Sequence, residues 1–234
     1  HTGHGTGFLI DGKYIDNSLG YCIMTNHHVY DDTKNLECIA RFFDLGQDKV
    51  TTEGERVDIP LSRRIVWSER HDYCVAELDP SYDWDKLRQS TNRFGRLLQP
   101  VRLSEDTPKL GDTLYVMGHS GDTPNSFHPM KVTGVKDTVF QNGHIEHDMY
   151  THMMVGRIEC EKLDNKSGPC KGNSGGPVFN TRGHVVGVYH AADSTSSFVV
   201  SVADITEDLN SEAIGLVKFS SGIYNGETWK FVRD

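Results

Sequence analysis

The sequence predicts an all-β protein of two lobes, with a short helix near the C-terminus. Short runs rich in β-branched and aromatic residues recur between Gly, Asp and Asn, which is typical of antiparallel barrels and not of alternating strands and helices. A polar stretch separates an earlier series of runs from a later one. The earlier series covers residues 7–10, 21–25, 37–43, 63–67 and 73–78, and the later one covers 113–117, 130–135, 152–160, 177–180, 185–189 and 198–202.

The polar stretch lies at residues 81–107 and has the composition of a linker. In the segment after the last strand-like run, Ile205, Leu209 and Ala213 share a helical spacing and acidic residues stand at its start, so we expect a short helix there. The predicted organisation is an N-terminal lobe at 1–82, a linker at 83–108, a C-terminal lobe at 109–204, and a helix and tail at 205–234.

The composition excludes several classes of protein. Hydrophobic residues make up 36% of the chain and charged residues 24%, and no apolar run approaches the roughly 18 residues that cross a bilayer. A formal charge of −9 argues against nucleic acid as a partner, because phosphate backbones require clustered cations. The chain begins with His1 rather than Met, so we expect a processed product or an excised domain, and a longer precursor or a regulatory domain is a candidate partner.

The number of cysteines is odd, so at least one thiol has no partner within the chain. Cys22 and Cys74 stand in apolar runs and are expected to be buried and free. A disulfide between Cys160 and Cys170 across a short loop is left open. The count favours a reducing intracellular compartment, with secretion as the alternative.

The most informative motif is the stretch GNSGGP at residues 172–177. A serine among glycines at this spacing suits a nucleophile, because its own N–H and that of Gly172 can point into an oxyanion hole. Glycines adopt backbone angles that other residues resist and allow a substrate to approach the main chain. Taken alone, the stretch could also be an ordinary turn.

Two further motifs stand at the edges of strand-like runs. Thr25 to Val29 reads TNHHV, with histidines at His27 and His28, and Asp72 opens the run at 73–78. The order is therefore histidine, aspartate, serine, which is one of the orders that serine proteases use.

These motifs together resemble the chymotrypsin-fold serine proteases, and most closely the branch of HtrA proteases, glutamyl endopeptidases and viral processing proteases. The matching pieces are GTGFLI at 5–10, MTNHHV at 24–29, Asp72 with the apolar residues after it, GDTLYVMG at 111–118, CKGNSGGPVF at 170–179 and GHVVGV at 183–188. The resemblance implies two six-stranded antiparallel β-barrels with the active site in the cleft between them.

The resemblance also implies a serine endopeptidase without a cofactor, acting on a protein or peptide substrate. Ser174 is then the nucleophile and His28 the base that takes its proton, while Asp72 accepts from the other ring nitrogen of His28. The oxyanion hole would be formed at Gly172, Asn173 and Ser174. His27 is the rival base, but its position in the motif is that of a neighbour of the catalytic histidine.

The digestive branch of the family is activated when a new N-terminal amine pairs with an aspartate just before the nucleophile. Here that position is Asn173, and the N-terminal segment is not apolar. A neutral asparagine needs no buried counter-charge, whereas an unpaired buried aspartate would be costly. We therefore expect activity without cleavage at the N-terminus.

The resemblance places the primary substrate pocket at Gly168, Tyr189, His190, Ala191 and Ala192. Gly168 offers no acid, so a preference for Lys or Arg is not expected. Glutamyl-specific relatives carry a pocket histidine at the position of Tyr189, one residue earlier than His190. A shift of one residue turns a strand side chain to the opposite face, although a bulge could bring His190 in. A preference for Glu or Gln and a preference for small or apolar residues both stay open.

No metal site is expected, since the sequence lacks the usual zinc spacing of cysteines or of helical histidines. The histidines that could suggest one are His1, His4, His144, His147 and His152. Two other functions stay open: a catalytically retired domain that binds peptide at a strand edge, and a protease or acyl transferase of narrow scope, such as one that cuts only its own polyprotein.

Overall fold

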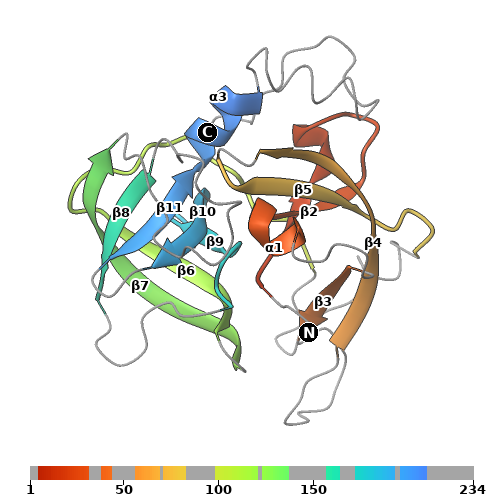
Figure 1. Ribbon diagram of the computed structural model, residues 1–234, viewed down its shortest axis with the longest axis horizontal. Coiled ribbons are helices and arrows are strands. Elements are labelled where there is room, and N and C mark those ends of the chain that lie inside the picture. Colours follow the sequence, from red (N-terminus) through yellow and green to blue (C-terminus); the bar gives the residue numbers. More distant parts are fainter. Residues whose placement is uncertain are drawn as a thin grey trace.

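The computed structural model describes residues 5–31, 38–43, 56–68, 71–82, 98–120, 123–136, 157–163, 172–192 and 196–209. They form two β lobes, with the C-terminal barrel on the left of Figure 1 and the N-terminal sheet on the right. The all-β, two-lobed fold predicted from the sequence is confirmed. Within the described residues, no helix is long and apolar enough to span a membrane.

The N-terminal lobe is a five-stranded antiparallel sheet in the order β1-β2-β5-β4-β3. Its strands are β1 (Phe8–Asp11), β2 (Tyr21–Thr25), β3 (Ile39–Phe43), β4 (Arg56–Ser68) and β5 (Tyr73–Leu78). β5 lies between β2 and β4, which fits its nearly unbroken run of buried residues. Two register shifts bend the long β4, so its first half pairs with β3 and its second half with β5.

This lobe differs from the predicted six-stranded barrel. As far as the structure describes it, the sheet has five strands and is not closed. Strand-like runs in the sequence predict that strands exist, but closure depends on hydrogen bonds between distant strands, and those leave no local pattern.

The C-terminal lobe is a closed six-stranded barrel in the order β10-β11-β8-β7-β6-β9, as predicted. Its strands are β6 (Thr113–Ser120), β7 (Thr123–Lys136), β8 (Arg157–Lys162), β9 (Pro177–Phe179), β10 (Val185–Ala192) and β11 (Ser197–Ser201). Ten buried residues, including Leu114, Met130 and Tyr189, fill its core. β10 pairs with β9 and β11 and carries part of the site described below.

Three short helices complete the described fold: the 3-10 helix η1 (Gly12–Tyr14), α1 (His27–Asp31) and α3 (Val202–Leu209). α3 begins at Val202, three residues before the predicted start at Ile205. Ser201 caps it, since its Oγ accepts from Asp204 N at 3.0 Å. Leu209 is its last described residue, and the predicted position Ala213 lies outside the described residues.

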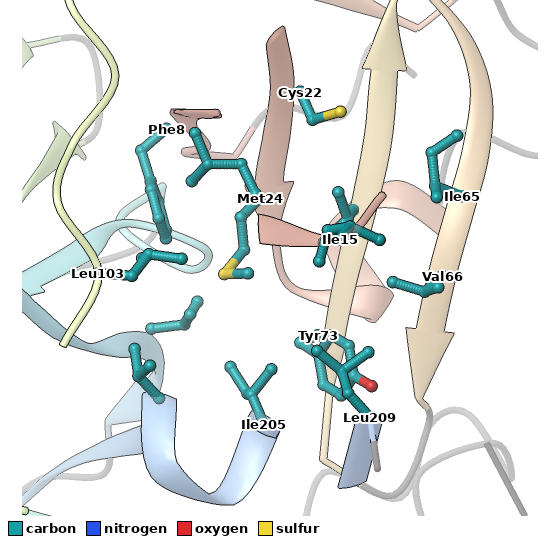
Figure 2. Packing of buried hydrophobic residues seen from close by; sticks show 14 of the residues in the cluster. Phe8, Ile15, Cys22, Met24, Ile65, Val66, Tyr73, Leu103, Ile205 and Leu209 are labelled. Atoms are coloured by element: carbon teal, nitrogen blue, oxygen red, sulfur yellow. The ribbon is translucent and has the colours of Figure 1, made fainter. Parts of the chain in front are cut away.

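A shared hydrophobic cluster fixes the two lobes against each other. Figure 2 shows Ile205 and Leu209 of α3 beside Tyr73 and Met24 of the N-terminal lobe. The described end of the linker adds main-chain contacts to both lobes: Val101 N donates to Leu9 O at 2.9 Å, and Ser104 N donates to Val185 O at 2.9 Å. Residues from the two lobes can therefore hold a precise mutual geometry.

Three of the described cysteines are fully buried in the core: Cys22, Cys74 and Cys160. Cys22 and Cys160 are fully buried free thiols. Burial raises the pKa of each to about 12, so both stay protonated and unreactive at neutral pH. Cys74 is buried as predicted, and Cys170 lies outside the described residues.

Candidate active site

Asp72 lies in the turn that leads into β5, and contacts from Asn26 and Asp208 hold that turn. Its φ of 48° is in the left-handed region, which aspartate tolerates better than most residues. The buried Asn26 donates from Nδ2 to Asp72 O at 2.8 Å. From α3, Asp208 accepts a hydrogen bond from the Tyr73 hydroxyl at 2.8 Å and lies 3.1 Å from His71 Nδ1. The Asp72 carboxylate is thereby fixed in a buried position.

His28 stands in the first turn of α1, directly after β2. Its main-chain N donates to Asp72 Oδ1 at 2.9 Å, and its ring Nδ1 lies 2.7 Å from Asp72 Oδ2. His27, the rival base, has its Nδ1 3.4 Å from Nη1 of Arg64 and so faces another part of the lobe. The structure therefore pairs His28, and not His27, with Asp72.

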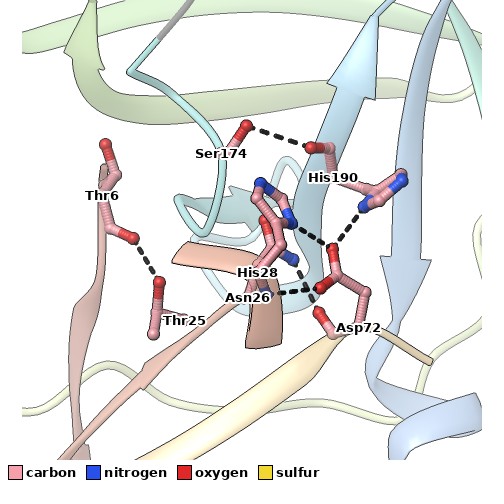
Figure 3. Close-up of polar contacts among 7 residues, drawn as sticks. All are labelled: Thr6, Thr25, Asn26, His28, Asp72, Ser174 and His190. Atoms are coloured by element: carbon pink, nitrogen blue, oxygen red, sulfur yellow. Dashed lines mark hydrogen bonds and ion pairs between the residues drawn. The ribbon is translucent and has the colours of Figure 1, made fainter. Parts of the chain in front are cut away.

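A second histidine reaches the same carboxylate from the other lobe. The register of β10 against β11 shifts between Tyr189 and Ala191, and this bulge contains His190. The buried ring of His190 has its Nδ1 2.5 Å from Asp72 Oδ2. The rings of His28 and His190 meet edge to face, with centroids 5.7 Å apart (Figure 3).

These contacts determine the charge of Asp72. Burial raises its pKa, but attraction and hydrogen bonds from His28 and His190 outweigh burial and hold the pKa below its usual range. The carboxylate is therefore ionised at neutral pH and can only accept hydrogen bonds. Both Nδ1 atoms must then carry a proton toward the carboxylate, and His28 can act as a base only while its Nε2 carries none.

The glycine-rich loop that carries Ser174 depends on two left-handed glycines. Gly172 has a φ of 105° and Gly175 one of 87°. Gly175 also lies against β2, since a Cβ there would stand 2.1 Å from Thr6 O and 2.2 Å from Thr25 Oγ1. Gly175 N donates to Tyr189 O at 2.8 Å, which attaches the loop to β10.

We expect Gly175→Ala to destabilise the protein more than Gly183→Ala does. Both positions have a positive φ, which costs an alanine about 1–2 kcal/mol. Nothing surrounds a Cβ at Gly183, whereas at Gly175 a Cβ overlaps main-chain atoms and adds at least about 2 kcal/mol. Urea unfolding of both variants measures the difference, and equal losses of unfolding free energy would contradict the described packing.

Thr6, just before β1, forms hydrogen bonds to two residues of the glycine-rich loop, Gly172 and Ser174. Its N donates to Ser174 O at 2.9 Å, and its Oγ1 donates to Gly172 O at 2.6 Å. The same Oγ1 accepts from His119 N at 2.9 Å. These bonds hold the peptide units from Gly172 to Ser174 in one orientation.

Within the described residues, the N–H groups of Gly172, Asn173 and Ser174 donate no hydrogen bond, whereas those of Gly175 and Gly176 do. The Asn173 side chain is fully buried, and its Oδ1 accepts from Ser126 Oγ at 3.2 Å. The neutral amide of Asn173 is therefore hydrogen-bonded to a neutral hydroxyl, that of Ser126.

The hydroxyl of Ser174 donates to the main-chain oxygen of His190 at 3.1 Å. In Figure 3 the His28 ring lies between Asp72 and Ser174. The structure thus brings together His28, Asp72, Ser174 and His190 from both lobes.

The predicted pocket residues are placed only in part. Tyr189 is buried in the barrel, with its hydroxyl 3.5 Å from Ser197 Oγ. Ala191 and Ala192 lie at the more open end of β10. Gly168 lies outside the described residues, as do the histidines that could have suggested a metal, so the pocket stays a prediction. The His190 ring is turned to Asp72.

His28, Asp72 and His190 also form a group of potential metal ligands whose ligand atoms lie within 4.8 Å of one another. Their geometry can be compared with that of zinc. Tetrahedral zinc with bonds of about 2.0–2.1 Å keeps its ligand atoms about 3.3 Å apart. The Nδ1–Oδ2 distances of 2.5 and 2.7 Å are shorter than this and are those of hydrogen bonds between the rings and the carboxylate.

Sequence reasoning did not assign a supporting role to Thr6, Asn26 or Asp208, nor the contact of His190 with Asp72. Thr6 and Asn26 stand inside motifs that the resemblance had matched, which was the available signal. Asp208 acts from a helix 136 positions after Asp72 in sequence number, and nothing local indicates that contact.

Comparison with solved structures finds proteases of similar fold. The Rv3671c protease in its inactive form matches with a TM-score of 0.56 and 16% identity, over 88% of this chain and 81% of that one. Deg5 matches with a TM-score of 0.56 and 20% identity, over 87% and 80%. The active form of Rv3671c from M. tuberculosis matches with a TM-score of 0.50 and 16% identity, over 88% and 71%.

At these identities the likeness concerns the fold. None of the curated proteins matches the chain in sequence. The sequence profile of the trypsin-like peptidase domain matches residues 5–188, which is most of the chain and includes β1 to β9 and the first part of β10. The chain therefore belongs to the trypsin-like peptidase family of chymotrypsin-fold proteases.

Proposed function

We propose that the protein is a serine endopeptidase in which Ser174 attacks the peptide carbonyl, His28 acts as the base and Asp72 orients His28. The observation that carries the proposal is the His28–Asp72 hydrogen bond of 2.7 Å in one lobe, facing a serine on a glycine-rich loop of the other. A serine hydroxyl is a weak nucleophile and needs such a base.

The reaction would begin with a small movement of the serine hydroxyl. Ser174 Oγ donates to His190 O, and it would have to leave this acceptor and turn toward His28 Nε2. Free enzymes of this kind often form the hydrogen bond to the base only when substrate binds. His28 then takes the proton as Oγ bonds to the carbonyl carbon, and returns it to the leaving amine. Water releases the acyl group in the second half of the reaction.

The negative charge on the substrate oxygen would be stabilised by the N–H groups of Gly172 and Ser174. Within the described residues these groups have no acceptor, and the peptide unit that carries the Ser174 N–H is fixed because its Asn173 O accepts from Gly176 N at 2.9 Å. Donors that are already oriented need no rearrangement during the reaction, and each contributes about 3 kcal/mol to the transition state.

The substrate would be a protein or peptide bound in extended form. The end of β10 at Ala191 and Ala192 pairs with β11 on one side, and the pairing of β9 with β10 stops at Val188. Main-chain groups at the end of β10 are therefore suitably placed to add a substrate strand.

Activity should not require a new N-terminal amine, because Asn173 is neutral and bonded by the neutral Ser126. We expect a chain extended by a short N-terminal tag to keep its kcat/KM within about twofold, since no charged partner is needed beside the nucleophile. Steady-state kinetics of tagged and tag-cleaved protein provide the measurement. A large gain on removal of the tag would show that an amine is needed after all.

The proposal is tested with a peptide library whose cleavage products are read by mass spectrometry, using native protein and Ser174→Ala. The expected result is a set of cleaved bonds that appear only with the native protein, and the residue before each bond reveals the pocket preference. Hydrolysis of activated esters without cleavage of any peptide would contradict the proposal and favour an acyl transferase.

A further inference from the structure

We infer that His190 is a positioning residue for the proposed reaction. It holds Asp72 of one lobe in a fixed position relative to Ser174 of the other lobe. The inference rests on the proposed function, but the contacts that carry it are independent of it. His190 is buried in the bulge of β10, and it touches both halves of the site with different groups.

The first contact joins the lobes through the side chain. His190 Nδ1 donates to Asp72 Oδ2 at 2.5 Å, beside the His28 Nδ1 that donates to the same oxygen at 2.7 Å. Because the main-chain N of His28 donates to Asp72 Oδ1, each carboxylate oxygen has a donor, and Oδ2 has two. Such an arrangement leaves the carboxylate little freedom to rotate, so the Nδ1–H of His28 keeps its direction.

The second contact is made by the main chain. His190 O accepts the hydroxyl of Ser174 at 3.1 Å. Asp72 and Ser174 stand on different lobes and do not touch, but both are hydrogen-bonded to His190 (Figure 3). The bulge makes this possible, because the extra residue breaks the strict alternation of side chains along β10.

This role differs from that of a pocket histidine. The His190 ring is buried and donates to Asp72, whereas the more exposed end of β10 is at Ala192. His190 is therefore expected to influence the rate of acylation and not the choice of substrate residue.

Three variants separate the side-chain contact from other effects. In His190→Asn, the amide Nδ2 stands the same number of bonds from Cα as the imidazole Nδ1, so the donor is kept. In His190→Leu, a methyl group takes that place in a side chain of similar size. Both keep the main-chain oxygen that binds Ser174. His184→Leu is the control, because it removes a histidine just before β10, roughly 20 Å away along the chain.

The experiment measures the rate of fluorophosphonate labelling of Ser174, kcat and KM for a peptide substrate, and the NMR resonances of the imidazole N–H protons. His190→Leu is expected to lower the labelling rate and kcat about 100-fold with KM nearly unchanged, and to weaken the His28 Nδ1–H resonance. His190→Asn should recover most of the rate, and His184→Leu should resemble the native protein.

Native rates and a native His28 resonance in His190→Leu would overturn the inference. An increase in KM alone would also overturn it, because it would indicate that His190 binds the substrate. If the folded native protein is not labelled but two imidazole N–H resonances disappear in Asp72→Asn, the proposed function fails while the cross-lobe contact stands. If His190→Leu does not fold, the comparison of His190→Asn with native protein decides, since loss of the His28 resonance despite a retained donor contradicts the inference.

Discussion

Replacing Ser174 or His28 with alanine is expected to lower kcat/KM for peptide hydrolysis by about 10⁶-fold. Ser174→Ala removes the atom that bonds to the substrate carbon, and His28→Ala removes the base that takes its proton. The two losses should not add in the double variant, because nucleophile and base act as one unit. Steady-state hydrolysis of one peptide, with thermal unfolding of each variant, measures the effect.

His27→Ala is the matched control, because the side chains of the two adjacent histidines face different partners. His27 lies near Arg64, whereas His28 lies on Asp72. We expect His27→Ala to keep kcat/KM within about 10-fold of the native value, since it touches no reacting group. A reversal, in which His27→Ala is inactive and His28→Ala is not, would refute the assignment of the base.

Asp72→Asn is expected to lower kcat by about 10⁴-fold, the scale of this change where an aspartate orients a catalytic histidine. Here two Nδ1–H groups share Oδ2, so an asparagine NH₂ in that position would oppose both donors, and an asparagine oxygen would lack the charge that stabilises protonated His28. Turnover of a peptide at pH 7 measures the loss.

The same substitution has a signature in stability. Because the pKa of Asp72 is held below its usual range, its ionised form stabilises the fold above about pH 4, and this contribution is lost as pH falls further. The gap in unfolding free energy between native protein and Asp72→Asn should therefore shrink below pH 4.

Asp58→Asn is the control for turnover. It changes an exposed partner of Arg41 and should leave turnover unchanged. A fully active Asp72→Asn variant would contradict the role given to this carboxylate.

The parts of the fold that follow from local patterns were predictable. Runs such as 73–78 and 185–189 appear as strands β5 and β10, because a stretch of apolar, β-branched residues favours a buried strand wherever the chain places it. The spacing of Ile205 and Leu209 likewise indicated α3. The motifs at 24–29 and 172–177 indicated the candidate site, because a histidine at the end of a strand and a serine among glycines are the groups that a base and its nucleophile require.

The parts that depend on long-range contacts were not predictable. The bend of β4 follows from two register shifts against β5, and the sequence does not mark them. His190 was interpreted as a pocket residue, because a bulge changes where a side chain points without changing its place in the motif. Thr6 joins Gly172 across 166 positions, and only the folded chain brings the two together.

Intact-mass measurement of the protein after reaction with a fluorophosphonate tests the central claim most directly. The reagent phosphonylates a serine only where a base and an oxyanion hole are assembled. We predict one adduct on the native chain, located at Ser174, and none on Ser174→Ala or His28→Ala. A native chain that is folded by circular dichroism and gains no adduct, or gains one that Ser174→Ala retains, would contradict the claim that Ser174, His28 and Asp72 form a working catalytic site.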